Sequence, residues 1–154
     1  MSIIISDDEE NKKGVKEMSE ILYGKEAQSK LLEGVNLVAN TIKGTLGPKA
    51  RTVIIKKNGK PVVINDGVTI AKAIQSDNEF VQMGVELLQQ VASEAQENTG
   101  DGTTTASILA QEMCNIGANM VNNGTDPIQL KKEIDESAKE VVGRLDAMAK
   151  PIDG

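Results

Sequence analysis

Apolar residues recur every three or four positions in four long stretches of the chain. This spacing is typical of an α-helix that buries one face, because 3.6 residues make one turn. We therefore predict helices over residues 26–43, 76–100, 103–122 and 125–150. A chain with these four helices is expected to be mainly α.

Residues near the ends of these stretches are typical helix caps. Ser76 and Glu79 form a capping box, and Thr125-Asp126-Pro127 places a proline at the first helical position. Gly100 and Asn123-Gly124 are typical of the residues that follow a helix C-terminus. These signals predict where two of the helices begin and where two end.

Each predicted helix has one apolar stripe that we expect to be buried. The four stripes are Ala27, Leu31, Val35, Val38 and Ile42; Phe80, Met83, Leu87, Leu88, Val91 and Ala95; Leu109, Met113, Ile116, Met120 and Val121; and Leu130, Ile134, Ala138, Val141, Leu145 and Met148.

Two β-branched runs, Thr52-Val53-Ile54-Ile55 and Val62-Val63-Ile64, flank the pair Asn58-Gly59. Asn-Gly favours a type I′ turn, whose two central residues both have positive φ, so we predict a β-hairpin over residues 52–64. Two strands alone leave both outer edges unpaired. The hairpin therefore either lies on the helices of its own chain or is completed by a strand from another subunit.

Residues 1–20 are polar and charged without a sustained period, and we expect them to be a flexible acidic extension. The start of the chain is too acidic for a secretory signal and has the wrong charge for a mitochondrial transit peptide, so a cytoplasmic location is expected. The carboxylates of residues 7–10 either add negative charge to a surface of an assembly or belong to a solvated tail.

The composition is that of one soluble globular domain: 154 residues, 39% hydrophobic and 26% charged. No histidine is present, which excludes Ser-His-Asp and Cys-His catalysis and histidine-ligated zinc. The single cysteine, Cys114, cannot form a disulfide within the chain. A net charge of −6 and only two aromatic residues argue against nucleic-acid binding, and no segment indicates a membrane span.

The loop before the third predicted helix, Gly100-Asp101-Gly102-Thr103-Thr104-Thr105, is a candidate anion site. Glycines allow close approach of the backbone to a phosphate, and the amides at a helix N-terminus face it with a positive dipole. Asp101 suits a hard cation that bridges phosphate oxygens. The alternative is an ordinary helix cap made by threonines.

Two further turns are candidates for the same site. Thr45-Leu46-Gly47-Pro48-Lys49 follows the first predicted helix, and Asp66-Gly67 follows the hairpin. Taken alone each is a plain turn, but Asp66 adds a second carboxylate that can act near the same cation or an attacking water. Neither a Walker A lysine loop nor a Gly-x-Gly-x-x-Gly motif is present in the sequence, which excludes P-loop and Rossmann sites.

Five segments, in order and at compatible separations, closely resemble the N-terminal part of a group I chaperonin subunit of the GroEL type. They are residues 34–39 (GVNLVA), 45–49 (TLGPK), 65–71 (NDGVTIA), 100–106 (GDGTTTA) and 126–131 (DPIQLK). The resemblance implies a multi-helical equatorial ATPase domain, of which residues 21–150 are the N-terminal part. By the same likeness residues 151–154 begin the connection to an intermediate domain, and the hairpin is a stem loop that pairs with a neighbouring subunit.

The resemblance also implies roles for individual residues. Asp101 is expected to ligate Mg²⁺, Thr45 and Thr104 are additional candidates for K⁺, and Asp66 is an auxiliary catalytic carboxylate. The residues expected to bind the nucleotide are Thr45, Leu46, Gly47, Pro48, Asn65, Gly67, Asp101, Gly102, Thr103, Thr104 and Thr105. Two positions depart from the family pattern: Asn65 stands where lysine is usual, and Ala50 where glycine is usual.

The implied function is ATP-dependent protein folding by a homo-oligomeric ring. The full subunit is expected to assemble into a double ring. Unfolded clients and a co-chaperonin would bind domains outside these 154 residues. By the same resemblance, the principal catalytic aspartate also lies outside them. This segment alone is therefore not expected to hydrolyse ATP efficiently. By the same likeness the helical stripes also pack against helices outside these residues, so apolar area is expected to be exposed here. The alternative is a naturally short, non-enzymatic protein that binds or caps a chaperonin ring.

Overall fold

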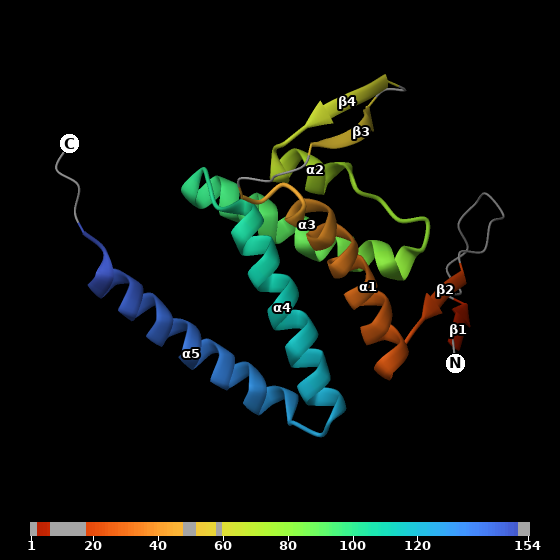
Figure 1. Ribbon diagram of the computed structural model, residues 1–154. Coiled ribbons are helices and arrows are strands. Elements are labelled where there is room, and N and C mark those ends of the chain that lie inside the picture. Colours follow the sequence, from red (N-terminus) through yellow and green to blue (C-terminus); the bar gives the residue numbers. More distant parts are fainter. Residues whose placement is uncertain (1–2, 7–17, 48–51, 58–59, 151–154) are drawn as a thin grey trace. The chain divides into compact units, whose positions relative to one another are not determined.

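The computed structural model of the protein describes residues 3–6, 18–47, 52–57 and 60–150 (Figure 1). Within these residues the chain forms helices and two antiparallel strand pairs. The elements are β1 (Ile3–Ser6), β2 (Met18–Ile21), α1 (Gly24–Lys43), β3 (Val53–Lys57), β4 (Lys60–Ile64), α2 (Gly67–Ala73), α3 (Glu79–Thr99), α4 (Thr103–Asn122) and α5 (Pro127–Met148). The prediction of a mainly helical fold is confirmed.

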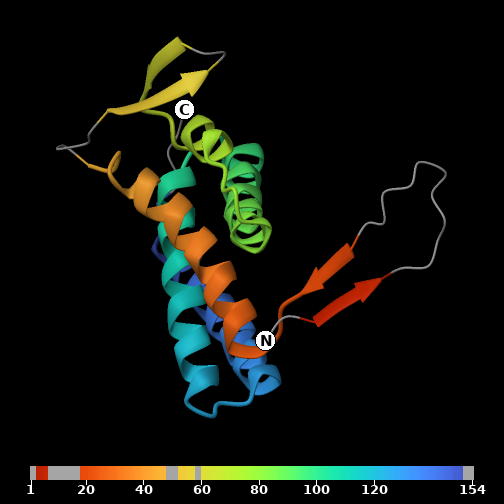
Figure 2. The ribbon, with the colours of Figure 1, turned by 90° about the vertical axis from the view of Figure 1, so that its right-hand side faces the viewer.

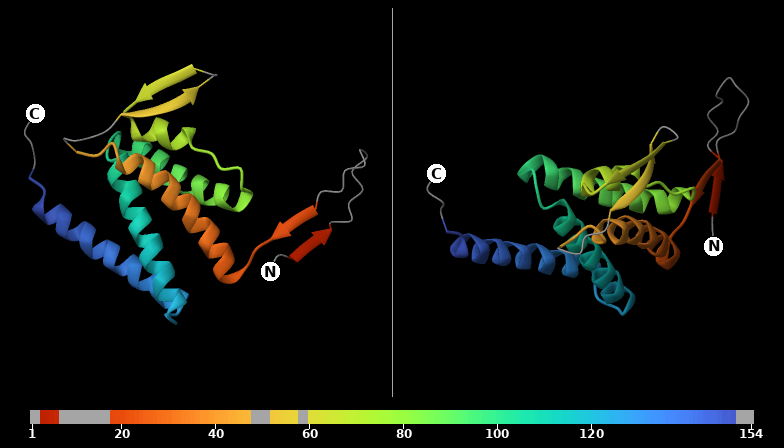
Figure 3. Two further views of the ribbon diagram at one scale, coloured as in Figure 1. Left: turned by 45° about the vertical axis from the view of Figure 1, so that its right-hand side comes forward. Right: turned by 45° about the horizontal axis from the view of Figure 1, so that its top comes forward.

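The chain divides into two compact units, one up to Asn115 and one from Ile116 onward. In the first unit α1 packs against α3, and the short helix α2 contacts both. Figures 2 and 3 show the β3–β4 hairpin beside α2, near the C-terminal end of α1. In the second unit Leu130, near the start of α5, is buried and lies 3.8 Å from the position of a Cβ added to Gly117 of α4.

The core of the first unit consists of small and branched aliphatic side chains from three helices. Its buried members are Val35, Val38, Ala39 and Ile42 of α1, Ile70 and Ala71 of α2, and Val85, Leu88 and Ala92 of α3. Val53 and Ile64, which pair with each other in the hairpin, pack against this core. The hairpin therefore rests on its own chain at one end.

The outer face of the hairpin is exposed. The side chains of Ile54 and Val63 are 69% and 65% accessible, and these two residues are also partners in the ladder. The predicted turn residues Asn58 and Gly59 lie outside the described residues. Completion of the sheet by another subunit stays a prediction.

Helix boundaries agree well with the sequence for α1, α4 and α5. Helix α4 covers the predicted residues 103–122, and α5 begins after the N-cap Asp126, with Pro127 in its first turn. The predicted capping box at Ser76 is wrong. The N-cap of α3 is Asn78, whose Oδ1 accepts the N–H groups of Phe80 and Val81, both at 3.1 Å.

Helix α2 was not predicted. It has seven residues, too few to show a helical period, and Asp66-Gly67 resembled a simple turn. The expectation of a flexible N-terminal extension is wrong for two of its segments. Ile3–Ser6 and Met18–Ile21 form an antiparallel strand pair. Three consecutive isoleucines favour such an extended strand. Residues 7–17 lie outside the described residues.

The predicted buried stripe is confirmed for three residues of α1 but is wrong for two residues of α3. Val35, Val38 and Ile42 are buried, whereas Met83 and Leu87 are each 52% exposed. The buried residues of α3 are Val81, Gly84, Val85, Leu88 and Ala92, of which Leu88 belongs to the predicted stripe. This face contains the one glycine of the helix, so it is the face on which α1 can approach the backbone.

The apolar stripes predicted for α4 and α5 are largely exposed. On α4 the exposed members are Leu109, Met113, Ile116 and Met120, and on α5 they include Val141, Leu145 and Met148. The buried residues of α4 are polar: Thr103, Ser107 and Gln111. Periodicity alone could not show that this helix buries its hydrogen-bonding face. No helix among the described residues is long and apolar enough to span a membrane.

Gly34 of α1 and Gly84 of α3 allow the two helices to touch through their backbones. A Cβ added to Gly34 would lie 2.1 Å from the carbonyl oxygen of Val81, and one added to Gly84 would lie 2.1 Å from the carbonyl oxygen of Leu31. Both distances are far below van der Waals contact, and a backbone oxygen cannot rotate away. Only glycine is compatible with this crossing.

We expect Gly34→Ala and Gly84→Ala each to lower the free energy of unfolding by about 3 kcal/mol or more, because the helices must separate. Urea denaturation followed by circular dichroism measures the change. Gly143→Ala in α5 is the matched control, since a Cβ there meets nothing within 4 Å. This control should be neutral or stabilising by up to about 1 kcal/mol, because alanine favours a helix. Equal effects of the three substitutions would contradict the close-packing account.

Candidate functional site

Two of the predicted site segments meet at Gly67, the buried first residue of α2, beside the end of the helix that precedes the third. A Cβ added to Gly67 would lie 3.1 Å from Thr104 Oγ1, 3.6 Å from Thr103 Cγ2 and 3.3 Å from Ile42 Cγ2. The C-terminal end of α1, the N-terminus of α2 and the N-terminus of α4 therefore converge. Figure 1 shows these three helix ends at the same side of the first unit.

The turn after α1 is closed by Thr45. Its N–H and its hydroxyl both donate to the carbonyl oxygen of Ile42, at 2.8 and 2.7 Å. Leu46 is half exposed, and Gly47 has φ of +81°, which favours glycine. The Thr45 hydroxyl oxygen keeps lone pairs for a cation or a donor, whereas Pro48 lies outside the described residues.

Asp66 is the N-cap of α2. Its Oδ2 accepts the N–H of Thr69 at 2.9 Å and also the Thr69 hydroxyl, and its Oδ1 accepts the N–H of Val68 at 3.3 Å. The pKa of the Asp66 carboxyl is lowered, first by the hydrogen bond from the Thr69 hydroxyl, and also by the two backbone N–H hydrogen bonds and the nearby Lys72. Burial opposes this lowering but does not reverse it. Asp66 is therefore an ionised carboxylate that holds the start of α2, and Asn65 precedes it on the surface.

A three-residue loop joins α3 to α4. Gly100 and Gly102 both have left-handed backbones, with φ of +71° and +79°. Asp101 Oδ1 accepts the N–H of Gly102 at 2.7 Å, and the Thr99 hydroxyl donates to the Asp101 carbonyl oxygen at 2.5 Å. Asp101 Oδ2 makes no hydrogen bond to any described residue, so one carboxylate oxygen faces solvent.

The first amides of α4 are available to a ligand. The first backbone bond of the helix runs from Ala106 N–H to the carbonyl oxygen of Gly102, at 2.9 Å. The N–H groups of Thr103, Thr104 and Thr105 find no acceptor among the described residues, as expected at a helix N-terminus. Such a terminus, with its positive dipole end, is a typical anion site.

The threonine side chains of this terminus face different surroundings. Thr103 is buried, and its hydroxyl lies 3.5 Å from Gln96 Oε1. Thr104 is half-buried beside Gly67, and Thr105 is exposed. Among the described residues no group of three or more acidic or cysteine side chains is arranged to hold a metal. A cation here would depend on Asp101 together with oxygens of the anion, which is how Mg²⁺ is commonly bound with phosphates.

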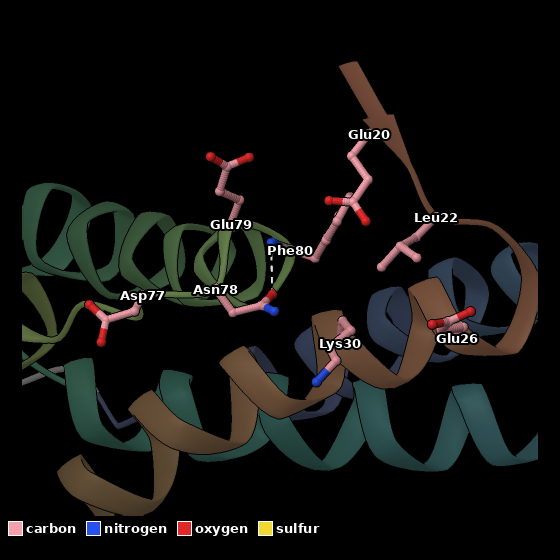
Figure 4. Close-up of a pocket in the computed structure, with 8 residues that line it drawn as sticks. All are labelled: Glu20, Leu22, Glu26, Lys30, Asp77, Asn78, Glu79 and Phe80. Carbon is pink, nitrogen blue, oxygen red and sulfur yellow. Dashed lines mark hydrogen bonds between the residues drawn. The ribbon is translucent and has the colours of Figure 1, made fainter. Parts of the chain in front are cut away.

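A separate pocket of about 320 Å³ lies between the start of α1 and the start of α3 (Figure 4). Its lining is Glu20, Leu22, Glu26, Lys30, Asp77, Asn78, Glu79 and Phe80. None of these is a predicted site residue. The structure thus brings Gly67, Thr103 and Thr104 together next to the end of α1, at a place distinct from this pocket.

Four amide side chains between α1 and α4 were not predicted from the sequence: Asn36, Asn40, Gln111 and Asn115. They bond across the two helices at 2.7 to 3.1 Å. Their signal in the sequence is the i, i+4 spacing of each pair, which places both members on one helix face. The pattern of apolar residues does not show this spacing.

Comparisons with known proteins point to one family. The family model described as the TCP-1/cpn60 chaperonin family matches residues 38–154. A protein named Chaperonin GroEL from Methanospirillum hungatei is 48% identical over 128 residues, which cover 83% of this chain and 24% of the relative. The Chaperonin GroEL of Onion yellows phytoplasma is 46% identical over 134 residues, 86% of this chain and 25% of the relative.

A solved structure agrees with these sequence matches. The crystal structure of the chaperonin gp146 from the bacteriophage EL 2 (Pseudomonas aeruginosa), in the presence of ATP-BeFx, is similar with a TM-score of 0.74 and 26% identity. The match covers 86% of this chain and 23% of the phage protein. The chain thus spans about a quarter of the length of the relatives it matches.

We expect Asp66→Ala to lower the free energy of unfolding by about 1 kcal/mol at neutral pH, because α2 loses its N-cap. Since the pKa of Asp66 is lowered from 3.8 by folding, its contribution is present above that value and is lost as the pH falls through the lowered pKa. Urea denaturation between about pH 7 and pH 2 should therefore show the difference between native and variant shrinking in acid.

The control for this series is Glu97→Ala, which removes an exposed carboxylate of α3 that caps no helix. A difference between native protein and Asp66→Ala that stayed constant through the acid range would contradict the capping role. NMR titration of the Asp66 side chain gives the direction of its pKa shift directly.

Proposed function

The chain belongs to the TCP-1/cpn60 chaperonin family, and from this we propose that it supplies the ATP-binding and ring-contact part of a protein-folding chaperonin subunit. The observation that carries the proposal is the convergence beside Gly67 of the α4 N-terminus, the α2 N-terminus and the end of α1. A phosphate chain needs backbone donors, close approach of the backbone and a ligand for its cation, and we assign these roles to the α4 N-terminus, the glycines and the exposed Asp101 carboxylate.

Binding would be shared between backbone and side chains. The N–H groups of Thr103, Thr104 and Thr105 are the donors toward the phosphates, with Gly102 and Gly47 allowing close approach. Other residues proposed to contact the nucleotide are Leu46, Pro48 and Asn65, together with Thr45 and Gly67. The absence of a Cβ at Gly67 leaves Thr104 Oγ1 uncovered, which suits the proposed second role of Thr104 as a K⁺ ligand with Thr45.

The exposed carboxylate of Asp101 is the proposed Mg²⁺ ligand. When bound, Mg²⁺ supplies charge neutralisation between phosphate oxygens. The Asp101 side chain already holds the Gly102 N–H at 2.7 Å, which orients the loop before any ligand arrives. Both Gly100 and Gly102 have positive φ, a conformation that glycine adopts without the steric cost of a Cβ.

Asp66 is proposed as an auxiliary carboxylate. Its two oxygens are held by the amides of α2 and by the Thr69 hydroxyl, so it contributes a fixed negative charge close to the phosphates. A carboxylate with a lowered pKa is a weak base, so Asp66 orients rather than removes a proton. The principal catalytic group belongs, on the family resemblance, to polypeptide beyond these residues, and turnover is a property proposed for the whole ring.

The exposed apolar faces favour a role as part of a larger subunit. Leu109, Met113 and Ile116 on α4, and Val141 and Leu145 on α5, are each at least half exposed. Faces of this kind are typical of surfaces that other polypeptide covers. We propose that the whole protein forms a homo-oligomeric, cytoplasmic ring, joined in part by strand addition at the β3–β4 hairpin, and that clients and co-chaperonin bind its other domains.

The decisive experiment measures binding of a non-hydrolysable ATP analogue to the native protein and to Asp101→Asn. Asparagine keeps an Oδ1 for the Gly102 amide but removes the negative charge. With Mg²⁺ present we expect affinity to fall at least about tenfold, as for the loss of an interaction with a charged group. With EDTA in place of Mg²⁺, the two proteins should bind alike.

Asp77→Asn is the matched control, because Asp77 is an exposed carboxylate in the separate pocket. Its affinity should equal that of the native protein under both conditions. Undiminished Mg²⁺-dependent binding by Asp101→Asn would rule out the metal role, and absence of binding by the native protein would rule out the proposed function.

A further inference from the structure

Four amide side chains form a polar seam between α1 and α4, made of Asn36, Asn40, Gln111 and Asn115. Gln111 Nε2 donates to Asn36 Oδ1 at 2.7 Å and to Asn40 Oδ1 at 2.9 Å. Asn36 Nδ2 donates a hydrogen bond to Asn115 Oδ1 at 3.1 Å, and Asn115 Nδ2 donates one to Asn36 Oδ1 at 2.9 Å. One glutamine thus joins two turns of α1 to α4.

The seam is the main directional link between these helices. The buried residues of α4 are Thr103, Ser107 and Gln111, and the Ser107 hydroxyl bonds within its own helix, to the Thr103 carbonyl oxygen at 2.8 Å. The only ion pair between the two helices among the described residues, Lys43 with Glu112, is exposed and 4.0 Å long. Such pairs contribute little. The seam therefore supplies the partly buried hydrogen bonds between α4 and α1, next to the apolar contact of Ala110 of α4 with the core.

Gln111 carries an energetic penalty in this position. Its side chain is 4% exposed, and its Oε1 is buried without a hydrogen-bond partner among the described residues. An unpartnered buried acceptor costs about 1–3 kcal/mol, which offsets much of what the two donated bonds contribute. An apolar side chain of the same length would pack here without that penalty. The amide therefore adds orientation more than stability.

We propose that Gln111 is a positioning residue for the phosphate site, an inference that rests on the proposed function. Gln111 follows Thr103 by eight residues, about 12 Å along α4, and Asn40 of α1 precedes Thr45 of the following turn by five residues. The seam therefore sets the offset between the amides that face the phosphates and the turn that completes the site. Anion recognition by fixed amides requires placement within about 0.5 Å, so a small slip of α4 weakens it.

The test compares three variants of the native protein in its natural assembly. Gln111→Met keeps the volume but removes both donors and the orphaned acceptor. Asn40→Asp keeps the acceptor for Gln111. Gln90→Met changes a glutamine of α3 that bonds only to Glu94 of its own helix, at 2.9 Å. Each is titrated with a non-hydrolysable ATP analogue and with AMP, both with Mg²⁺, and its melting temperature is measured.

For Gln111→Met we expect analogue affinity to fall about five- to tenfold. Its AMP affinity should fall less than about twofold, and its melting temperature should stay within about 2 °C of native. Asn40→Asp and Gln90→Met should match the native protein in all three measurements. The loss of selectivity for the longer phosphate chain is the readout that a purely structural role would not produce.

Native analogue affinity in Gln111→Met would overturn the inference, and so would a lower melting temperature with unchanged affinities or an equal effect of Gln90→Met. Should Gln111→Met fail to fold, Asn40→Leu removes one acceptor at the exposed edge of the seam, and it should weaken analogue binding about threefold. Native affinity there would overturn the inference as well. Absence of nucleotide binding by the unsubstituted protein would instead reject the proposed function, and this inference with it.

Discussion

The backbone contact between α1 and α3 is the constraint on which the first unit depends. Gly34 and Gly84 each lie where any side chain would collide with a carbonyl oxygen of the opposite helix. This contact sets which face of α3 is buried and draws Val85, Leu88 and Ala92 onto Val35, Val38 and Ile42. The small helix α2 then closes the core with Ile70 and Ala71, and this packing places Gly67 beside Thr104. The site is thus a consequence of how tightly two helices cross.

Much of this architecture could be predicted from the sequence, because long helices show a regular spacing of apolar residues and have recognisable capping residues. The limits of α4 and the Asp126-Pro127 start of α5 were predicted correctly, and so was the hairpin that joins Val53 to Ile64. The buried faces were harder. On α3 a glycine decides which side is buried, and on α4 hydrogen bonding does, and neither effect appears in a hydrophobic pattern. The seven residues of α2 and the strand at Ile3–Ser6 are too short to carry a periodic signal.

The site residues illustrate the same division. Glycines and threonines around Asp101 could be selected from their chemistry, because anion binding at a helix start demands those residue types. The contact of Gly67 with Thr103 and Thr104 could not be predicted without the structure, because 36 or 37 positions separate these residues in the chain. Asp66 shows how one residue serves two purposes: the bonds that cap α2 also keep its carboxylate charged. Roles that depend on contact across helices, like that of Gln111, lie beyond what residue types reveal.

The length of α1 has a mechanical consequence. Its twenty residues run without interruption from the end of β2 to the turn closed by Thr45, a distance of about 30 Å. The crossing at Gly34 and Gly84 lies near the middle of this helix, so a substitution that moves α1 away from α3 would also displace the Thr45 turn at the end of the same continuous helix.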